Sequence, residues 1–452
     1  MSRYNSSKSV GYRKPVWLDS NDPRARSEYE LEKFRSRIGA EVLVKDKVIK
    51  NIELEEYNPK NHFYSVITAS SPGIPIWGFD MGPDGSVIVS VAKFITGEWY
   101  FDGKIVKYSP DGNTLWQKEY FRDGQHVTTD SIVTMSNGDS VLFFQNFVKV
   151  SGSSGNILST KAYPNTFFGN LSRDSSNNIY GYNFSVDANL NFRWENNYDI
   201  PDHYVYFEDK SRNIVNGYFY IVGSAEVSSS PYTPSAFIAK VNASDGSIAW
   251  ARQLYPPSGY NMIEAYRVEA DSTGVYLSGQ TYNGTDYVTW VAKYDTNGNF
   301  VWGKKIGYFS IYNTSISIIG TNIYILYSNV YMVSLKNDGT FRFARHLDVP
   351  ITLGSIGPKT DSANMYLAGI ESSYPNPYNA FVAKIYPEIS TQNNQTLGSY
   401  NITDTEISGS VSTIAFTSSS SAFYRTSVSE IPGIEATYTQ NDVSLTITTK
   451  AF

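Results

Sequence analysis

Hydrophobic and polar positions alternate in short runs along residues 62–390, which is typical of antiparallel β-strands. The runs are separated by Gly, Asn and Asp turns, as in DSTGVYLSG (271–279) and DSANMYLAG (361–369). No helical period occurs within this region. The pattern therefore predicts an all-β fold for most of the chain.

A second pattern repeats at longer range, in the form of a tight turn followed by a tryptophan. SPDGNTLW ends at Trp116, SDGSIAW at Trp250 and TNGNFVW at Trp302. Degenerate copies of the same motif end at Trp77, Ser159, Trp194 and Phe343. The mean spacing is about 44 residues, within the range of four-stranded propeller blades. Seven such units predict a seven-bladed β-propeller over residues 62–390.

The two ends of this repeated region complement each other. The last unit has the strand AFVAKIY (380–386), but no Asp-Gly turn and tryptophan follow it. The missing piece occurs at the start, as SPGIPIW (71–77). We expect this N-terminal segment to supply the outermost strand of the last blade. Closure of this kind would remove the open sheet edges that promote aggregation.

These repeats resemble the seven-bladed propeller repeats of the family called SBBP, and more loosely the quinoprotein propellers. The resemblance covers about 330 residues and implies a fold, with the Asp-Gly pair forming a turn and the tryptophan packing flat between blades. It implies no activity, because the cysteine pair of the quinoprotein site is absent and no acidic cluster can be assigned to a metal.

The flanking segments differ from the propeller. Residues 1–61 are predicted to form an arm, with a short helix in SEYELEKFRSRIG and a hairpin over 41–57. Residues 391–452 are rich in Ser and Thr and are predicted to form a small β-module. Neither segment has a core of its own, so we expect the arm to dock on another subunit. The predicted docking residues are the cations Arg3, Lys8, Arg13 and Lys14 and the apolar stripe Leu31, Phe34 and Ile38.

Composition excludes several functions. The 452 residues carry 37 basic and 43 acidic side chains, a net charge of −6 that argues against general nucleic-acid binding. The absence of cysteine excludes disulfides, cysteine nucleophiles, thiolate zinc sites and iron–sulfur clusters. No run approaches the roughly 18 apolar residues of a membrane helix, and no secretory signal is recognisable. We therefore expect synthesis in the cytoplasm without membrane insertion.

Motifs for metals and cofactors are equally sparse. The four histidines lie far apart in sequence, at positions 62, 126, 203 and 346. DTNGN (295–299) begins like a calcium loop, but position 306 is Ile where the bidentate Glu would be expected. A tight turn is the simpler interpretation of this segment. We expect no metal and no cofactor.

The loops between the second and third strands of the blades are the predicted binding surface. Seven aromatic residues fall in them, namely Trp99, Tyr100, Tyr232, Tyr282, Tyr287, Tyr374 and Tyr378. Exposed aromatic residues among Asn and Ser suit stacking on a sugar or packing on a protein. The alternative is that tyrosine is simply abundant here, with 36 in the chain.

Three functions follow from these observations. We expect a non-enzymatic structural or adhesion component of a larger assembly, in style a bacteriophage virion protein of the tail, baseplate or capsid surface. Its arm would dock on other subunits and its loops would face outward. The first alternative is a carbohydrate-binding propeller. The second is a glycosidase or lyase with carboxylates at the propeller mouth, for which Glu226, Glu264 and Glu371, in or near predicted loops, are the candidates.

Overall fold

The computed structural model divides the chain into two compact units, residues 1–60 and 61–452. It describes residues 76–94, 101–122, 125–126, 129, 131–143, 146–161, 170–200, 202–227, 234–256, 259–308, 315–327, 331–346, 351–353, 359–360, 364–371 and 379–385, and beyond these only the backbone of short strands. The described residues contain strands and turns but no helix. None of these segments could therefore cross a membrane as a long apolar helix.

The first unit contains two strand pairs. Strand β1 (Ser2–Tyr4) pairs antiparallel with β2 (Val16–Leu18), and β3 (Val42–Val44) pairs with β4 (Lys47–Ile49). The second pair corresponds to the hairpin predicted over 41–57. The helix predicted in 27–39 and the side chains of the seven predicted docking residues lie outside the described residues.

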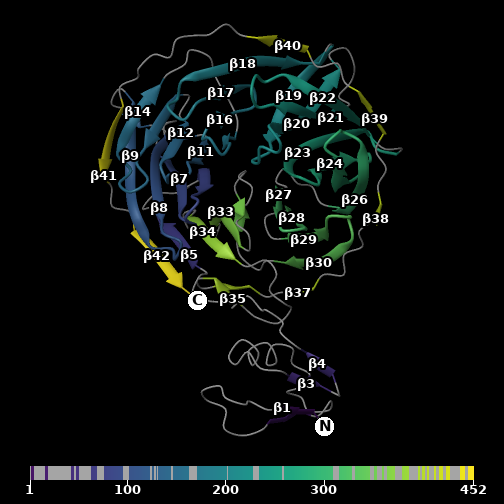
Figure 1. The fold of residues 1–452 in the computed structure, drawn as a ribbon, viewed down its shortest axis with the longest axis horizontal. Helices are drawn as coiled ribbons and strands as arrows, with labels where there is room; N and C mark the ends of the chain where they lie inside the picture. The colour runs from purple at the N-terminus through teal and green to yellow at the C-terminus, as the bar shows by residue number, and fades with distance from the viewer. Residues whose placement is uncertain are drawn as a thin grey trace. The chain divides into compact units, whose positions relative to one another are not determined.

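The second unit contains a ring of antiparallel sheets, which confirms the β-propeller (Figure 1). Seven sheets of four to six strands can be traced among the described strands. The first three, from the innermost strand outward, are β6 (Ile76–Met81), β7 (Val87–Phe94), β8 (Phe101–Tyr108) and β9 (Thr114–Arg122), extended by β10 (Gln125–His126); β11 (Ser131–Thr134), β12 (Ser140–Phe143), β13 (Phe147–Val150) and β14 (Ile157–Lys161); and β15 (Ser172–Arg173), β16 (Ile179–Tyr180), β17 (Phe184–Val186) and β18 (Phe192–Asp199).

The next three blades follow the same order from the inside outward. They are β19 (His203–Lys210), β20 (Tyr218–Val227), β21 (Ser235–Asn242) and β22 (Ile248–Tyr255); β23 (Met262–Asp271), β24 (Gly274–Tyr282), β25 (Tyr287–Tyr294) and β26 (Phe300–Tyr308); and β27 (Ser315–Ile319), β28 (Asn322–Tyr327), β29 (Tyr331–Lys336) and β30 (Phe341–His346). Within each blade, the innermost strand begins on one face of the ring and ends on the other.

The ring closes through a strand from the N-terminal side, but not the one expected. In the last blade, β31 (Ile351–Leu353) and β32 (Lys359–Thr360) pair with β33 (Met365–Glu371), followed by β34 (Asn379–Ile385) and then β5 (Phe63–Thr68). The segment 71–77 does not close the ring, because β6, which begins at Ile76, pairs with β7 as the innermost strand of the first blade. The closing segment lies about ten residues earlier in the chain.

Residues 391–452 differ from the predicted module. Apart from the hairpin of β35 (Gln395–Leu397) and β36 (Tyr400–Ile402), their strands add to the outer edges of the blades. They run backward around the rim in Figure 1, as β37 (Thr405–Glu406) on β30, β38 (Ser412–Thr413) on β26, β39 (Thr417–Ser420) on β22, β40 (Tyr424–Ser427) on β18, β41 (Tyr438–Asp442) on β9 and β42 (Thr446–Ala451) on β5. A polar Ser/Thr alternation suits such an outer strand, since its exposed face meets water.

Four of the predicted tryptophan anchors occupy equivalent positions on the fourth strands of their blades, whereas Trp77 lies on the innermost strand β6 and is not such an anchor. Each of the four indole N–H groups donates to a carbonyl in a turn of the next blade, over 3.0–3.1 Å. The pairs are Trp116–Gly152, Trp194–Ala243, Trp250–Thr296 and Trp302–Asn337. Trp116 and Trp302 are buried as predicted, whereas Trp250 is only partly buried.

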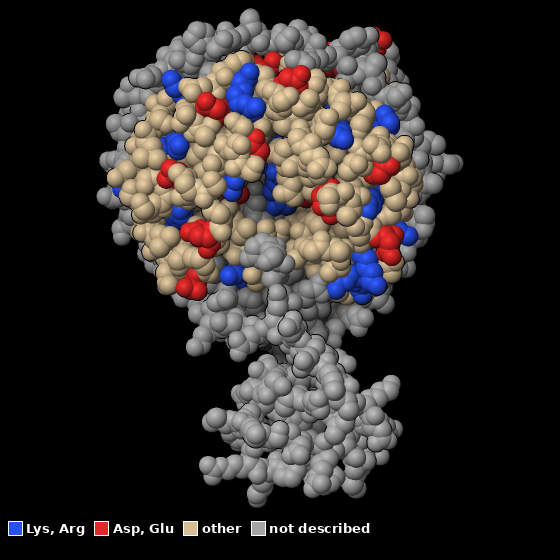
Figure 2. Space-filling model, viewed as in Figure 1, with Lys and Arg blue, Asp and Glu red and all other residues tan. Residues whose placement is uncertain are grey.

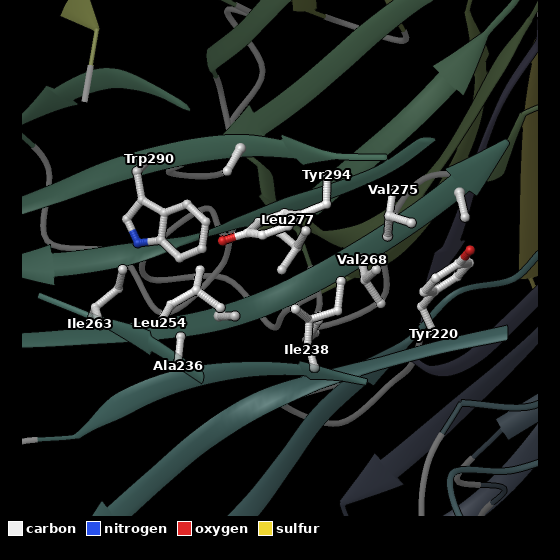
Figure 3. Packing of buried hydrophobic residues seen from close by; sticks show 14 residues of the cluster. Tyr220, Ala236, Ile238, Leu254, Ile263, Val268, Val275, Leu277, Trp290 and Tyr294 are labelled. Atoms are coloured by element: carbon white, nitrogen blue, oxygen red, sulfur yellow. The ribbon is translucent and has the colours of Figure 1, made fainter. Parts of the chain in front are cut away.

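Apolar side chains pack between neighbouring blades, most extensively between the fourth and fifth. Figure 3 shows Tyr220, Ile238 and Leu254 of the fourth blade against side chains of the fifth. On the fifth side lie Ile263 and Val268, both from its innermost strand β23. Burial of each large side chain contributes on the order of 1.5–3 kcal/mol. This packing holds the fourth and fifth blades in fixed positions relative to each other.

Candidate functional site

Irregularities in the two neighbouring innermost strands β19 and β23 define the candidate site. The register of β19 shifts between Phe207 and Asp209, and that of β23 shifts between Ala265 and Arg267. Glu208 and Tyr266 are therefore the extra residues of two β-bulges. Bulges re-aim side chains and are over-represented next to active sites.

Glu264 lies on β23 and is buried, with 8 % of its surface exposed. Its Oε2 atom accepts hydrogen bonds from the Tyr266 hydroxyl at 2.5 Å and from Nε2 of Gln280 at 2.9 Å. Gln280 lies directly opposite Glu264 on β24. The sequence placed Glu264 in or near a loop, whereas it belongs to an innermost strand.

Glu208 lies in a different environment, and its carboxyl group is half-buried rather than buried. Burial raises the pKa of Glu208, and the negative charges of Glu264 and Asp209 raise it further, while the Arg267 guanidinium opposes them. The pKa of Glu208 therefore lies above its ordinary value. Its protonated form persists to higher pH than that of a solvated glutamate.

The groups around this pair fix its geometry. The Tyr182 hydroxyl donates to the backbone carbonyl of Glu208 at 3.0 Å. One carboxylate oxygen of Asp209 accepts the backbone N–H of Val268 at 3.0 Å, and the other accepts Nδ2 of Asn170 at 2.9 Å. Asn170, Asp209 and Val268 belong to three successive blades. Asp209 thus ties β19 to both neighbours and holds Glu208 beside β23.

Two neighbouring carboxyl groups, one with a raised pKa and one held in place by two hydrogen bonds, are suited to general acid–base chemistry. The first can donate a proton to a leaving group, and the second can activate water or act as a nucleophile. Glu208 was missed in the sequence, because YVYFEDK (204–210) shows only an alternating strand. The bulge that turns Glu208 toward β23 depends on pairing with β20 and has no local signal.

The start of β19 carries two unusually exposed aromatic side chains. Tyr204 is 60 % exposed and Tyr206 is 48 % exposed. The intervening Val205 and Phe207 pack against the buried apolar cluster on the opposite face of the strand. Because side chains alternate along a strand, Tyr204 and Tyr206 share the face that leads to Glu208.

A cavity of about 860 Å³ lies at the other end of the innermost strands and is lined by all seven blades. Figure 2 shows a central hollow in the ring with Lys and Arg at its edge. The carboxylates that line the cavity are engaged in structural contacts. Asp174 accepts the Tyr180 hydroxyl at 2.8 Å, and Glu269 pairs with Arg212. We interpret this end as the place where the blades are joined.

Only part of the predicted binding surface lies within the described residues. Tyr282 and Tyr287 are directly opposite each other in the β24–β25 hairpin, with ring centroids 4.7 Å apart. The hairpin opens on the same face of the ring as the starts of β19 and β23. The other five predicted aromatic residues, Trp99, Tyr100, Tyr232, Tyr374 and Tyr378, lie outside the described residues.

The remaining candidates from the sequence do not join the carboxyl pair. Glu226 lies near the end of β20, opposite Tyr204. Glu371 ends β33, and its side chain lies outside the described residues. Asp295 accepts the backbone N–H groups of Asn297 and Asn299 at 2.9 and 2.8 Å, so DTNGN is a turn. Among the described residues, no group of three or more His, Asp or Glu side chains could hold a metal ion.

Comparison with known proteins finds similarity only to solved structures. No protein-family model and no curated protein matches the chain. BamB from Moraxella catarrhalis is 12 % identical over 72 % of this chain and 95 % of its own, with a TM-score of 0.40. The WD40 propeller domain of Doa1 is 10 % identical over the same shares, with a TM-score of 0.42. An α-L-arabinofuranosidase from Fusarium graminearum is 8 % identical over 71 % and 97 %, with a TM-score of 0.40.

This comparison corrects the predicted function. At such low identity the likeness concerns the fold alone, and the reported structures include arabinofuranosidases and an arabinanase rather than virion proteins. The prediction of a structural component of a phage particle is therefore wrong.

Proposed function

We propose that this propeller hydrolyses glycosidic bonds, with Glu208 as the general acid and Glu264 as the second catalytic carboxyl group. The observation that carries the proposal is the placement of two carboxyl groups on neighbouring innermost strands, each next to a β-bulge. The pKa of Glu208 is raised, and Glu264 is buried and held by hydrogen bonds from Tyr266 and Gln280. The SBBP-like repeats would supply the scaffold on which this pair is mounted.

In the proposed reaction, Glu208 gives its proton to the glycosidic oxygen as the bond from that oxygen to the anomeric carbon breaks. Water supplies the hydroxyl group that the anomeric carbon gains, and its remaining proton restores Glu208 or passes to Glu264. Glu264 stabilises the positive charge that develops on the sugar ring. Arg267, which lowers the pKa of Glu208, keeps it from becoming too weak an acid.

The test is release of reducing ends from polysaccharides and of aryl groups from synthetic aryl glycosides. Glu208→Gln and Glu264→Gln should each lower turnover at least 100-fold while the proteins remain folded. Glu119→Gln is the control, because Glu119 lies on the outer strand β9 of the first blade, where it pairs with Lys104. Wild-type rates in both pair variants would reject the proposal. Binding of a polysaccharide without turnover would also reject it and favour a non-catalytic carbohydrate-binding propeller.

A further inference from the structure

We propose that Tyr204 and Tyr206 form a stacking platform that binds the sugar rings of an extended polysaccharide next to Glu208. The inference rests on the proposed function for its choice of ligand, and it adds a binding site that the carboxyl pair does not contain. It also specifies the substrate class, which is a chain of several sugar units rather than a single sugar or a short glycoside.

The exposure of these two rings is the first argument. Other large aromatic side chains of this blade and the next are buried between the blades, as are Tyr220 on β20 and Trp290 on β25. Tyr204 and Tyr206 remain 60 % and 48 % exposed. An exposed tyrosine face is apolar, while its hydroxyl can still bond to water or to a ligand.

The direction of the two rings is fixed by their neighbours in the strand. Phe207 stacks on Tyr182 with centroids 6.0 Å apart and meets Phe237 edge-on at 5.7 Å. Val205 packs against the same cluster. Because these side chains anchor one face of β19, Tyr204 and Tyr206 cannot turn inward without breaking that packing.

The spacing suits a chain of sugars. Residues two apart on a strand lie about 7 Å apart on one face. Two rings at this distance can contact successive sugar units, and Glu208 follows two residues after Tyr206, as the extra residue of the bulge. Tyr204, Tyr206 and Glu208 therefore form a track along β19 toward the carboxyl pair.

The ligand is inferred to be a glycan rather than a protein because the exposed apolar surface of β19 consists of two aromatic rings with a carboxyl group at each end. Glu226 lies opposite Tyr204 in the sheet, and Glu208 ends the track. Apolar rings flanked by carboxylates match the alternating C–H and hydroxyl surface of a sugar. A protein partner would need a wider apolar surface.

Binding is measured by affinity electrophoresis and calorimetry with arabinan, xylan, dextran and a bacterial polysaccharide. Tyr204→Ala and Tyr206→Ala should each weaken binding about 10-fold, and the double variant more. Tyr206→Phe should retain most affinity, because the ring face is kept. Tyr255→Ala is the matched control, since Tyr255 is 41 % exposed but lies on the outer strand β22.

The measurements separate this inference from the proposed hydrolysis. Glu208→Gln should still bind the polysaccharide, so loss of binding on Tyr204→Ala supports the platform even if no glycan is cleaved. If cleavage occurs, the tyrosine variants should raise KM for a long substrate and leave turnover of a small aryl glycoside unchanged. No binding to any of the polysaccharides, or equal binding by wild type and the double variant, would overturn the platform.

Discussion

The indole N–H of Trp250 donates a hydrogen bond of 3.1 Å to the carbonyl oxygen of Thr296 in the next blade. Its ring lies against Gly298, where a β-carbon would come within 2.9 Å of the indole. Gly298 also has a φ of +80°, which glycine adopts without strain. The tryptophan of one blade thus requires a glycine turn in the next blade, both for its hydrogen bond and for the space that its ring occupies.

Replacing Trp250 by Ala should therefore lower the free energy of unfolding by about 3 kcal/mol, through loss of packing and of the inter-blade hydrogen bond. Urea unfolding followed by circular dichroism measures the change. Leu115→Ala is the control, because Leu115 is 51 % exposed and its truncation should cost under about 0.5 kcal/mol. Equal stabilities for the two variants would contradict the anchor role.

Arg212 links three blades, and its loss should be costly. Its guanidinium pairs with the buried Glu269 and donates to the carbonyl of Ile316 at 3.2 Å. Arg212→Met leaves a buried carboxylate without its cation, which should cost about 3–5 kcal/mol. The double variant with Glu269→Gln should recover much of that loss. Thermal unfolding of the three proteins tests this, and additive losses would show that the pair is not coupled.

Stability should depend on pH through Glu208. Since the folded pKa of Glu208 lies above its unfolded value, its favourable contribution is complete at acid pH and is lost as pH rises through the folded value. Glu208→Gln should therefore raise Tm relative to wild type at pH 8, and the gain should vanish near pH 4. Glu226→Gln serves as the control. A gain in Tm that grows toward acid pH would show that folding lowers the pKa of Glu208 instead of raising it.

Arg267 should set the alkaline limit of the proposed hydrolysis. The pKa of Glu208 is raised by burial, Glu264 and Asp209 and lowered by Arg267. Arg267→Met should raise it further, so that the protonated acid survives to higher pH and the alkaline limb of kcat/KM moves upward. Arg252→Met, which removes a guanidinium bonded to Gly298, should leave the limb in place. A limb that moves downward would refute the role of Arg267.

The repeat units could be predicted because their signals are local. The Asp-Gly turns and the anchors Trp116, Trp194, Trp250 and Trp302 lie at fixed offsets, and each makes the expected contact with the next blade. The closing strand was misplaced because SPGIPIW (71–77) ends in a tryptophan like the other repeats, whereas residues 63–68 carry no such motif. The pairing of β34 with β5 identifies the true closing strand.

The candidate site was harder to predict, since it depends on strand register rather than on residue type. Glu264 was found as a possible carboxylate, but its hydrogen bond to Gln280 follows from cross-strand pairing that no short motif encodes. Glu208 was missed for the same reason. The exposed Tyr204 and Tyr206 lie in an ordinary strand sequence, and only their exposure in the folded chain sets them apart.

Strand β5 is paired on both sides, by β34 and by β42. Its residues 63–68 therefore meet partners more than 300 positions later in the chain. During synthesis β5 leaves the ribosome long before β34 and β42 are made. Until then it has no strand to pair with and is prone to aggregate. Because contacts of such long sequence separation form slowly, folding should be slow and end with this sheet. Once both neighbours are in place, releasing β5 requires two ladders to break, so its detachment should be slow as well.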